Sequence, residues 1–357
     1  MLHKHKFITS FVLPAGDMTA IPALIQERDR FPSNGSVIHG LYIRVVGSAV
    51  VAAVGGATIL ANGVARFIRS IQLDGDVRKN IYRCTGKDLA ILNLLNAGVP
   101  AAQTLPGGVA GGTAAQGAHA FDLLLHIPFA RGHGARPVDC AFDTFKERLS
   151  IVIQPGNAAD LLSGDAAATI AAGCTVEMYA DVDDSPKLTD LPIFTPSFER
   201  ILMQITGTTP NFSFLLPTGD RIYNRLVTHQ ETLATQAAIS SLITGNLGLR
   251  VNQSDFIKGD NVPFAFFHQE MVRRYRLQAA DVPVGLAVFD FFERGKISDS
   301  LESMTKTRGN VELLAGVAGN AGDDGVILMD CVKAIPPELR RPNQPSTVAS
   351  VAAPAGA

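Results

Sequence analysis

The chain has 357 residues, of which 46% are hydrophobic and only 18% charged, and its net charge is −2. A chain of this length can bury large cores and usually divides into two domains. The near-neutral charge excludes a broad electrostatic surface for nucleic acid, so we expect no sequence-specific nucleic-acid partner. Four scattered cysteines without a Cys-x-x-Cys pair indicate buried free thiols in a reducing compartment: Cys84, Cys140, Cys174 and Cys331.

The first third of the chain predicts mainly β-strands. Residues 7–13 and 36–47 are apolar and rich in β-branched side chains, and residues 67–73 alternate up to the turn pair Asp74-Gly75. Residues 45–65 carry no charge and are long enough for a membrane-spanning helix. Their Val and Ala content and the pair Gly55-Gly56 favour two buried strands joined by a turn.

A helix is predicted next. Thr85 and Asp88 have the spacing of a capping box, and Leu89, Leu92 and Leu95 recur at helical intervals before Gly98 and Pro100 end the pattern. A Gly/Ala-rich loop follows over residues 100–117.

A long-period repeat organises the rest of the chain. Phe-x-Arg-Gly closes an apolar strand at residues 129–132 and again at 292–295. A second strand follows each at the same offset of 22 residues, around Ile151 and around Leu314. Other segments correspond as well, with 221–228 in the place of 37–44 and 247–251 in the place of 67–73. One β-unit used twice is therefore predicted.

The second unit also predicts a helix, which begins near Pro263. Phe264, Phe267, Met271 and Tyr275 share one face of it, and Arg273 and Arg274 are expected to point away. Strands at 174–180 and 326–334 close the two units.

The polar, Pro-containing segment 181–187 is the expected boundary. We therefore assign residues 1–186 to the first unit, 187–335 to the second and 336–357 to a Pro/Ala-rich C-terminal arm. That arm cannot build its own core. It is either a loose tail or an arm that lies on a neighbouring subunit.

No catalytic, cofactor-binding or metal-binding residues are predicted. His3 and His5 lie at a solvated end, His126 and His133 lack counterparts in the second unit, and neither acidic run (181–184, 323–324) has calcium-loop spacing. Gly86-Lys87-Asp88 lacks the rest of a Walker loop, and the glycines at 107–112 precede a strand. There is no Gly-x-Ser-x-Gly elbow. The start of the chain is basic but lacks a cleavage site, so no signal peptide is expected.

Two successive β-units, each with a helix in one long connection, predict an all-β fold of two eight-stranded antiparallel jelly rolls. The duplication and the passage Ile71-Gln-Leu-Asp-Gly75, Ile81-Tyr82 and Thr85-Gly-Lys-Asp-Leu89 resemble the double-jelly-roll major capsid proteins of the tectivirus–adenovirus lineage. The resemblance covers residues 1 to about 335.

What the resemblance implies is a structural coat protein and no enzyme. Members of that family form trimers whose six jelly rolls make pseudo-hexameric capsomers of an icosahedral capsid. The expected partners are further copies of the chain, penton and minor capsid proteins and an internal lipid membrane, and the expected location is the virion after synthesis in the host cytoplasm. The alternative is a two-domain β-sandwich enzyme or glycan-binding protein of the bicupin type. Its metal-binding His-x-His, expected on a strand, is absent from the predicted strands of both units.

Overall fold

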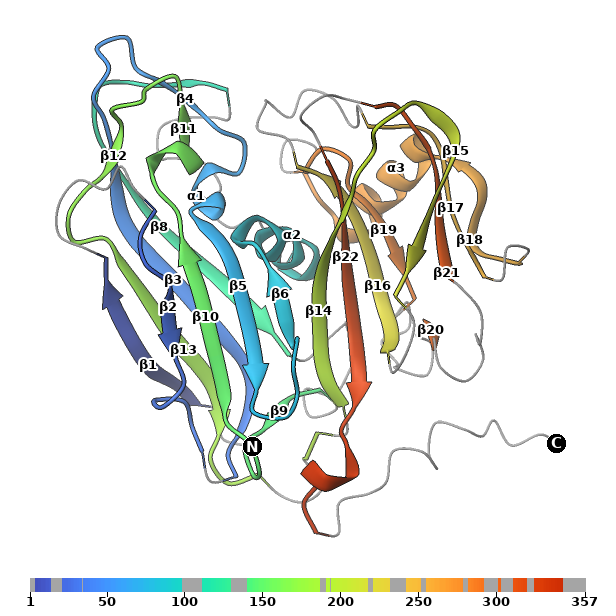
Figure 1. Ribbon diagram of the computed structural model, residues 1–357, viewed down its shortest axis with the longest axis horizontal. Coiled ribbons are helices and arrows are strands. Elements are labelled where there is room, and N and C mark those ends of the chain that lie inside the picture. Colours follow the sequence, from blue (N-terminus) through green and yellow to red (C-terminus); the bar gives the residue numbers. More distant parts are fainter. Residues whose placement is uncertain are drawn as a thin grey trace.

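The computed structural model describes residues 4–13, 21–33, 35–97, 111–129, 140–186, 191–192, 194–217, 221–231, 242–251, 255–278, 282–291, 301–302, 311–319 and 324–342. Two β-sandwiches stand side by side, and the long strands of both run along the same direction (Figure 1).

The first sandwich contains eight principal antiparallel strands in two sheets. One sheet has the order β1 (Lys4–Val12), β13 (Thr175–Asp183), β3 (Val37–Val51), β8 (Gly117–Pro128). The facing strands have the order β2 (Ile25–Glu27), β10 (Leu149–Pro155), β5 (Ile68–Gly75), β6 (Tyr82–Cys84). Short strands extend the edges: β9 (Phe142–Asp143) and β12 (Thr169–Ile170) pair with β3, and β4 (Ala57–Ile59) pairs with β7 (Thr113–Ala114) and β11 (Leu162–Ser163).

The second sandwich repeats this order strand for strand. Its first sheet runs β14 (Phe194–Met203), β22 (Gly325–Ala334), β16 (Arg221–Gln230), β19 (Ala287–Asp290), with β20 (Leu301–Glu302) added beside β16. Its second sheet runs β15 (Thr209–Leu216), β21 (Val311–Val317), β17 (Ile243–Val251), β18 (Asp255–Pro263). The two sheet orders are those of a jelly roll, so the predicted pair of eight-stranded jelly rolls is confirmed.

The predicted repeat is confirmed at the level of strands. β8 and β19 occupy the same position in their sheets, and so do β10 and β21, the strands that follow them at the constant offset. The Arg-Gly pairs at 131–132 and 294–295 lie outside the described residues.

The two jelly rolls share one continuous sheet. β6 of the first pairs in parallel with β14 of the second, with Tyr82 opposite Phe198 and Arg83 opposite Glu199, and a nine-stranded sheet results. Their relative position is therefore set by main-chain hydrogen bonds as well as by side chains.

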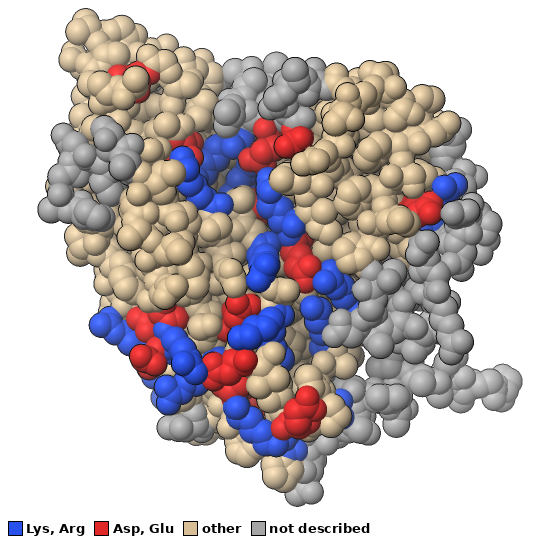
Figure 2. All heavy atoms as spheres, in the orientation of Figure 1, with Lys and Arg blue, Asp and Glu red and all other residues tan. Residues whose placement is uncertain are grey.

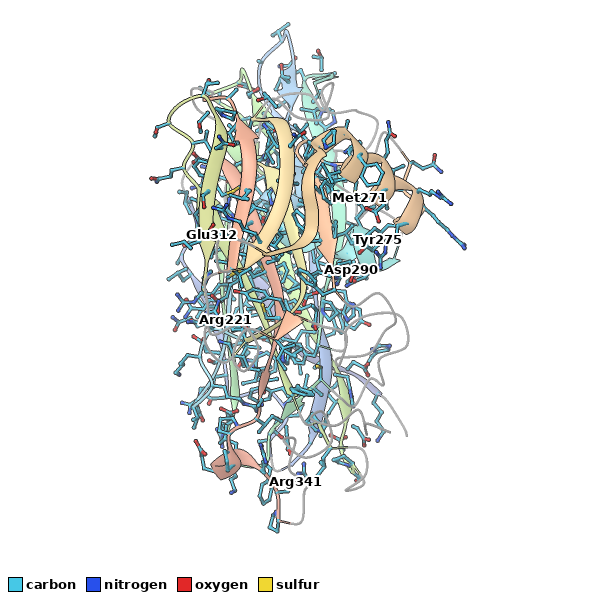
Figure 3. All side chains as sticks on the ribbon, turned by 90° about the vertical axis from the view of Figure 1, so that its right-hand side faces the viewer. Arg221, Met271, Tyr275, Asp290, Glu312 and Arg341 are labelled. Atoms are coloured by element: carbon cyan, nitrogen blue, oxygen red, sulfur yellow. The ribbon has the colours of Figure 1, made fainter. Side chains whose placement is uncertain are left out.

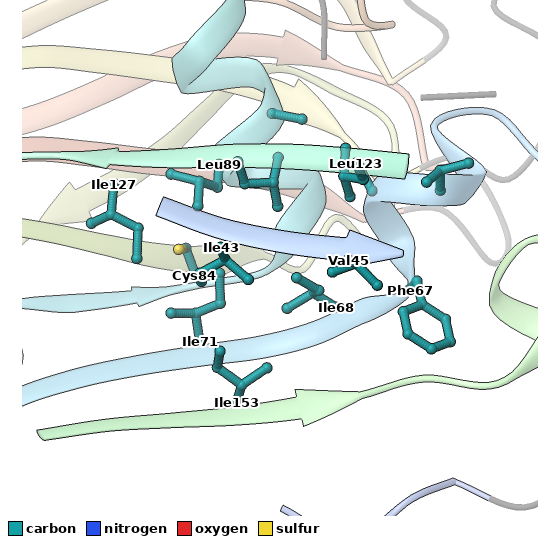
Figure 4. Packing of buried hydrophobic residues seen from close by; sticks show 14 of the residues in the cluster. Ile43, Val45, Phe67, Ile68, Ile71, Cys84, Leu89, Leu123, Ile127 and Ile153 are labelled. Carbon is teal, nitrogen blue, oxygen red and sulfur yellow. The ribbon is translucent and has the colours of Figure 1, made fainter. Parts of the chain in front are cut away.

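The core of the first jelly roll forms because inward side chains alternate along each strand. Ile43 and Val45 on β3 face Ile71 on β5 and Ile153 on β10, and all four are at most 1% exposed (Figure 4). Each such side chain contributes about 1.5–3 kcal/mol by its burial. Truncating one, as in Ile43→Ala, costs about 2–5 kcal/mol.

Residues 45–65 form no membrane-spanning helix. β3 continues to Val51, a turn follows, and β4 and α1 (Gly63–Arg66) complete the segment, so the prediction of strands joined near Gly55-Gly56 is confirmed. In the described part of the chain, no helix is both long and apolar enough to cross a membrane.

Both predicted helices are present, α2 (Gly86–Ala97) and α3 (Phe264–Tyr275), each in the connection between the fifth and sixth principal strands of its jelly roll. The capping box is confirmed: Thr85 Oγ1 accepts from the Asp88 amide at 3.2 Å, and Asp88 Oδ2 accepts from the Thr85 amide at 2.9 Å. On α3 the orientation predicted for Arg274 was wrong. Its guanidinium lies 3.3 Å from Asp290 of β19, because the carboxylate at the neighbouring strand attracts the long side chain back over the helix.

Candidate functional site

Helix α2 fills the seam between the two jelly rolls. Nine of its twelve residues are buried, which is the pattern of a helix enclosed on all sides. Leu89 and Leu92 belong to the same apolar cluster as Phe198, Val227 and Leu328 of the second jelly roll. Gly86 permits this close packing, because a Cβ there would overlap the Ala65 carbonyl oxygen and lie 2.9 Å from Ile68 Cβ.

The first turn of α2 places a carboxylate in the middle of this seam. Asp88 is fully buried; its Oδ1 lies 2.9 Å from His229 Nε2 and its Oδ2 lies 3.0 Å from Arg200 Nε. Burial alone would raise the pKa of Asp88, but the His229 hydrogen bond and the Arg200 charge hold that pKa below its ordinary value. The carboxylate is therefore ionised and paired.

A second carboxylate, Glu231, follows at the end of β16. Its oxygens lie 3.1 Å from Arg66 Nη1, 3.0 Å from Arg200 Nη2 and 3.8 Å from Lys87 Nζ. Burial would raise the pKa of Glu231, but Lys87, His229 and Arg66 lower it. Lys87 is 2% exposed and donates to the Gln230 carbonyl at 2.7 Å. We call this set the seam cluster: Arg66, Lys87, Asp88, Arg200, His229 and Glu231.

The seam cluster has the residue types of a metal site but not its electrostatics. Ligand-type atoms of Asp88, His229 and Glu231 lie within 4.8 Å of one another. Three cationic side chains already occupy the two carboxylates, so a divalent cation would have to displace them and meet an excess of positive charge. The arrangement joins the jelly rolls and does not present an open coordination site.

In the lower part of the seam, a buried arginine links α2 to the second jelly roll. Arg225 of β16 is buried and donates to Asp330 Oδ2 at 2.8 Å and to Asn96 Oδ1 of α2 at 2.8 Å. Nearer the surface, Glu199 lies 3.1 Å from Arg221 and 3.8 Å from Lys333. Figure 2 shows charged side chains along the boundary between the two lobes, whereas the upper parts of both lobes are largely uncharged on this face.

A further charged cluster ties the base of the first jelly roll to β14. Arg78 is buried, pairs with Glu147, hydrogen-bonds Thr195 of β14, and stacks 4.3 Å above the centre of the Phe142 ring. A buried arginine with this many partners fixes the position of the connecting segment.

The start of the predicted C-terminal arm returns to the first jelly roll. After the 3-10 turn η5 (Pro337–Leu339), Arg341 donates two hydrogen bonds of 2.8 Å to the Asp143 carboxylate. It also donates to the Gly35 carbonyl. Lys146 donates to the Glu338 carbonyl at 2.6 Å. Residues 336–342 therefore pack on their own chain, and residues 343–357 lie outside the described residues.

Among the other described residues weighed from the sequence, His5 lies on strand β1 with its ring centre 5.5 Å from that of Tyr42, which also contacts His126. All four cysteines are buried and free, as predicted. His126 stacks on Tyr42 with ring centres 4.4 Å apart. Lys87 and Asp88, considered for phosphate, are enclosed in the seam. His3, His133, Asp323 and the glycines at 107–110 lie outside the described residues.

Sequence reasoning missed the seam cluster. Its members come from segments separated by up to 165 residues, so spacing along the chain does not reveal it. One local signal exists: Lys87 and Asp88 are the only charged residues of α2, which is otherwise mainly apolar, and such charges need partners when the helix is buried.

Comparisons with known proteins identify the fold. No protein-family model matches the chain, and no curated protein sequence matches it significantly. A chain from the atomic structure of Sulfolobus Turreted Icosahedral Virus is similar, with a TM-score of 0.70 and 14% identity over 98% of this chain and 95% of that one. The STIV major capsid protein gives 0.68 and 14% over 94% and 97%. The major capsid protein P2 from bacteriophage PM2 gives 0.57 and 10% over 94% and 99%. The chain therefore has the double-jelly-roll fold of these capsid proteins.

Proposed function

We propose that this chain is a structural coat protein that trimerises into pseudo-hexameric capsomers and tiles an icosahedral capsid. The observation that carries the proposal is the fusion of two jelly rolls of identical strand order through one continuous sheet. Three such chains supply six similar units around a threefold axis, which is the geometry that a hexagonal tile needs. The structural neighbours, which are viral major capsid proteins, support the same assignment.

The domain boundaries belong to this proposal. We assign residues 1–186 to the first jelly roll, 187–335 to the second and 336–357 to a C-terminal arm that continues beyond the Arg341 contact. The end of β1 that carries Lys4 and the red turn η5 both lie at the lower end of the strands (Figure 1). The first and last described segments of the chain thus lie at the same end of the molecule.

That end of the molecule is proposed to face the particle interior. Lys4 and Lys6 at the start of β1 are exposed and would suit an anionic lipid membrane. Penton and minor capsid proteins are proposed as further partners, and the virion, after synthesis in the host cytoplasm, as the location. Deleting residues 1–6 should weaken membrane retention of assembled particles, and unchanged assembly and retention would contradict this role.

The alternative, a two-domain enzyme or glycan-binding protein of the bicupin type, is less well supported. Within the described residues, the one group with metal-ligand chemistry is Asp88, His229 and Glu231, and its carboxylates are neutralised by Arg66, Lys87 and Arg200. We therefore propose that the protein is not an enzyme.

The experiment that tests the proposal is assembly of the purified full chain. Light scattering after size-exclusion chromatography should give three times the 37.8 kDa of one chain or a larger shell. A monomer at all concentrations that retains a metal ion or binds glycans would favour the alternative.

A further inference from the structure

The two jelly rolls cover their equivalent sheets to different extents. In the second, β22 is buried without interruption from Gly325 to Val332, so both faces of its sheet are covered. In the first, β13 alternates between buried and partly exposed residues, so one face of its sheet is open. The difference arises because α2 and the first jelly roll lie on the outer face of β14, β22 and β16.

The open face of the first jelly roll nevertheless carries apolar and aromatic side chains. Phe7 on β1 is 55% exposed and lies with its ring centre 5.5 Å from that of Tyr179 on β13. Leu124 on β8 is 53% exposed. A continuous patch of this kind is typical of a protein–protein interface. We call it the outer face: Phe7, Tyr42, Leu124, His126 and Tyr179.

Helix α3 is much less buried than α2. It occupies the same connection as α2, but only three of its twelve residues are buried: Phe264, Phe267 and Met271. Tyr275 donates to Asp290 at 2.7 Å and anchors the helix to β19, and Figure 3 shows α3 standing outside the strands of the second jelly roll. Phe266 on its free side is 56% exposed.

We infer that α3 of one copy docks on the outer face of a second copy, and so repeats between chains the seam that α2 makes within one chain. The inference rests on the proposed trimer and names its contact surfaces. Because the contact is heterologous, each chain gives α3 to one neighbour and receives α3 from the other, and the ring closes after three chains.

Strand edges agree with this docking. Within the chain, β6 pairs with β14; their equivalents are β18 and β1, each of which pairs on one side only among the described strands. On the outer face the carboxylates of Asp122 and Glu177 are already paired with Arg44. The inferred contact therefore rests on the apolar and aromatic side chains and on the two strand edges.

The test uses Phe266→Asp and Phe7→Asp, one from each side of the contact, with Leu215→Asp as the matched control. Leu215 is 56% exposed on β15. β15 is the equivalent of β2, whose outward residue Gln26 is exposed and uncovered, so the control position lies outside the inferred contact. Circular dichroism and urea midpoints like those of the wild type will show that the variants fold.

The wild-type chain and Leu215→Asp should elute as trimers, and Phe266→Asp and Phe7→Asp should each elute as monomers, with trimer dissociation constants raised at least 100-fold. Equal amounts of the two monomeric variants should then form a two-chain species, because one intact α3 meets one intact outer face.

Each other outcome has a definite meaning. If the wild type is a trimer and both variants remain trimers, the outer face serves other partners and the inference is wrong, while the coat function stands. Monomeric variants that fail to complement each other, or dissociation of Leu215→Asp as well, would also overturn it. A wild type that never self-associates would instead contradict the proposed function.

Discussion

Replacing Asp88 by Asn tests whether the seam cluster fastens the two jelly rolls. The Asp88 carboxylate accepts from Thr85, lies 2.9 Å from His229 Nε2 and pairs with Arg200 at 3.0 Å. Asparagine keeps the size and an oxygen for the helix cap, but it removes the charge. Arg66, Lys87 and Arg200 would then share the single carboxylate of Glu231 inside the seam.

The expected magnitude follows from burial. Removing one partner of a buried ion pair costs about 3–5 kcal/mol. Removing one partner of an exposed pair costs about 0–1 kcal/mol. The Arg28–Asp76 pair has a similar separation, 2.9 Å, but its side chains are 54% and 39% exposed. Asp76→Asn is therefore the matched control.

Urea denaturation at pH 7, followed by circular dichroism, measures both variants. With a slope of about 3 kcal/mol/M for a chain of this size, Asp88→Asn should lower the midpoint by about 1–1.7 M. Asp76→Asn should lower it by less than about 0.3 M. Equal shifts for the two variants would refute the reasoning that the seam cluster stabilises the junction.

The pH dependence of stability gives a second test, in which wild type is compared with Asp88→Asn. Burial favours a higher pKa for Asp88, but His229 and Arg200 leave the folded-state pKa below the ordinary 3.8. The stabilisation is therefore fully present above the unfolded-state pKa and is lost as pH falls through the folded-state value. The stability difference between wild type and Asp88→Asn should be constant from pH 7 to about 5 and shrink below about pH 4. A difference that grows on acidification would contradict this.

Three further predictions concern packing, the C-terminal segment and the thiols. Gly86→Ala should lower the free energy of unfolding by about 1–3 kcal/mol through overpacking, whereas Gly55→Ala, which meets open space, should be nearly neutral; equal urea midpoints would argue against the close packing of α2. A chain ending after residue 335 should melt several degrees lower than the full chain, because it loses Arg341 and its two hydrogen bonds to Asp143; identical melting temperatures would show that this contact does not stabilise the fold. Burial raises the pKa of Cys174 to about 12, and all four thiols are buried. The native protein should therefore react slowly with a thiol reagent at pH 8, and the unfolded protein should show four reactive thiols per chain. Rapid labelling of the native protein would contradict that burial.

Much of the fold could be predicted because its signals are local or repeated. Alternation of Val176, Met178 and Ala180 predicts a half-buried strand, and β13 alternates in that way. The constant spacing between paired strands in the two halves predicts the duplication. Two strands were missed. β6 has only three residues, and β15, although eight residues long, begins with Thr-Pro-Asn, so pairing with neighbouring strands and not intrinsic propensity makes these segments strands.

The seam could not be predicted, because its contacts join residues from different parts of the chain. Asp88 and His229 are 141 positions apart, and Arg341 and Asp143 are 198 apart. The expectation that Arg274 points away failed for a related reason. Helical spacing places its Cα, but Asp290 on a later strand decides where the guanidinium lies.

An electron-microscopy image of the purified, assembled full chain tests most directly whether each chain contributes two jelly rolls to a trimeric capsomer. We expect capsomers with threefold symmetry and six lobes of similar size around each axis, two from every chain. Particles whose chains contribute a single lobe, or a protein that stays monomeric under every assembly condition, would contradict it.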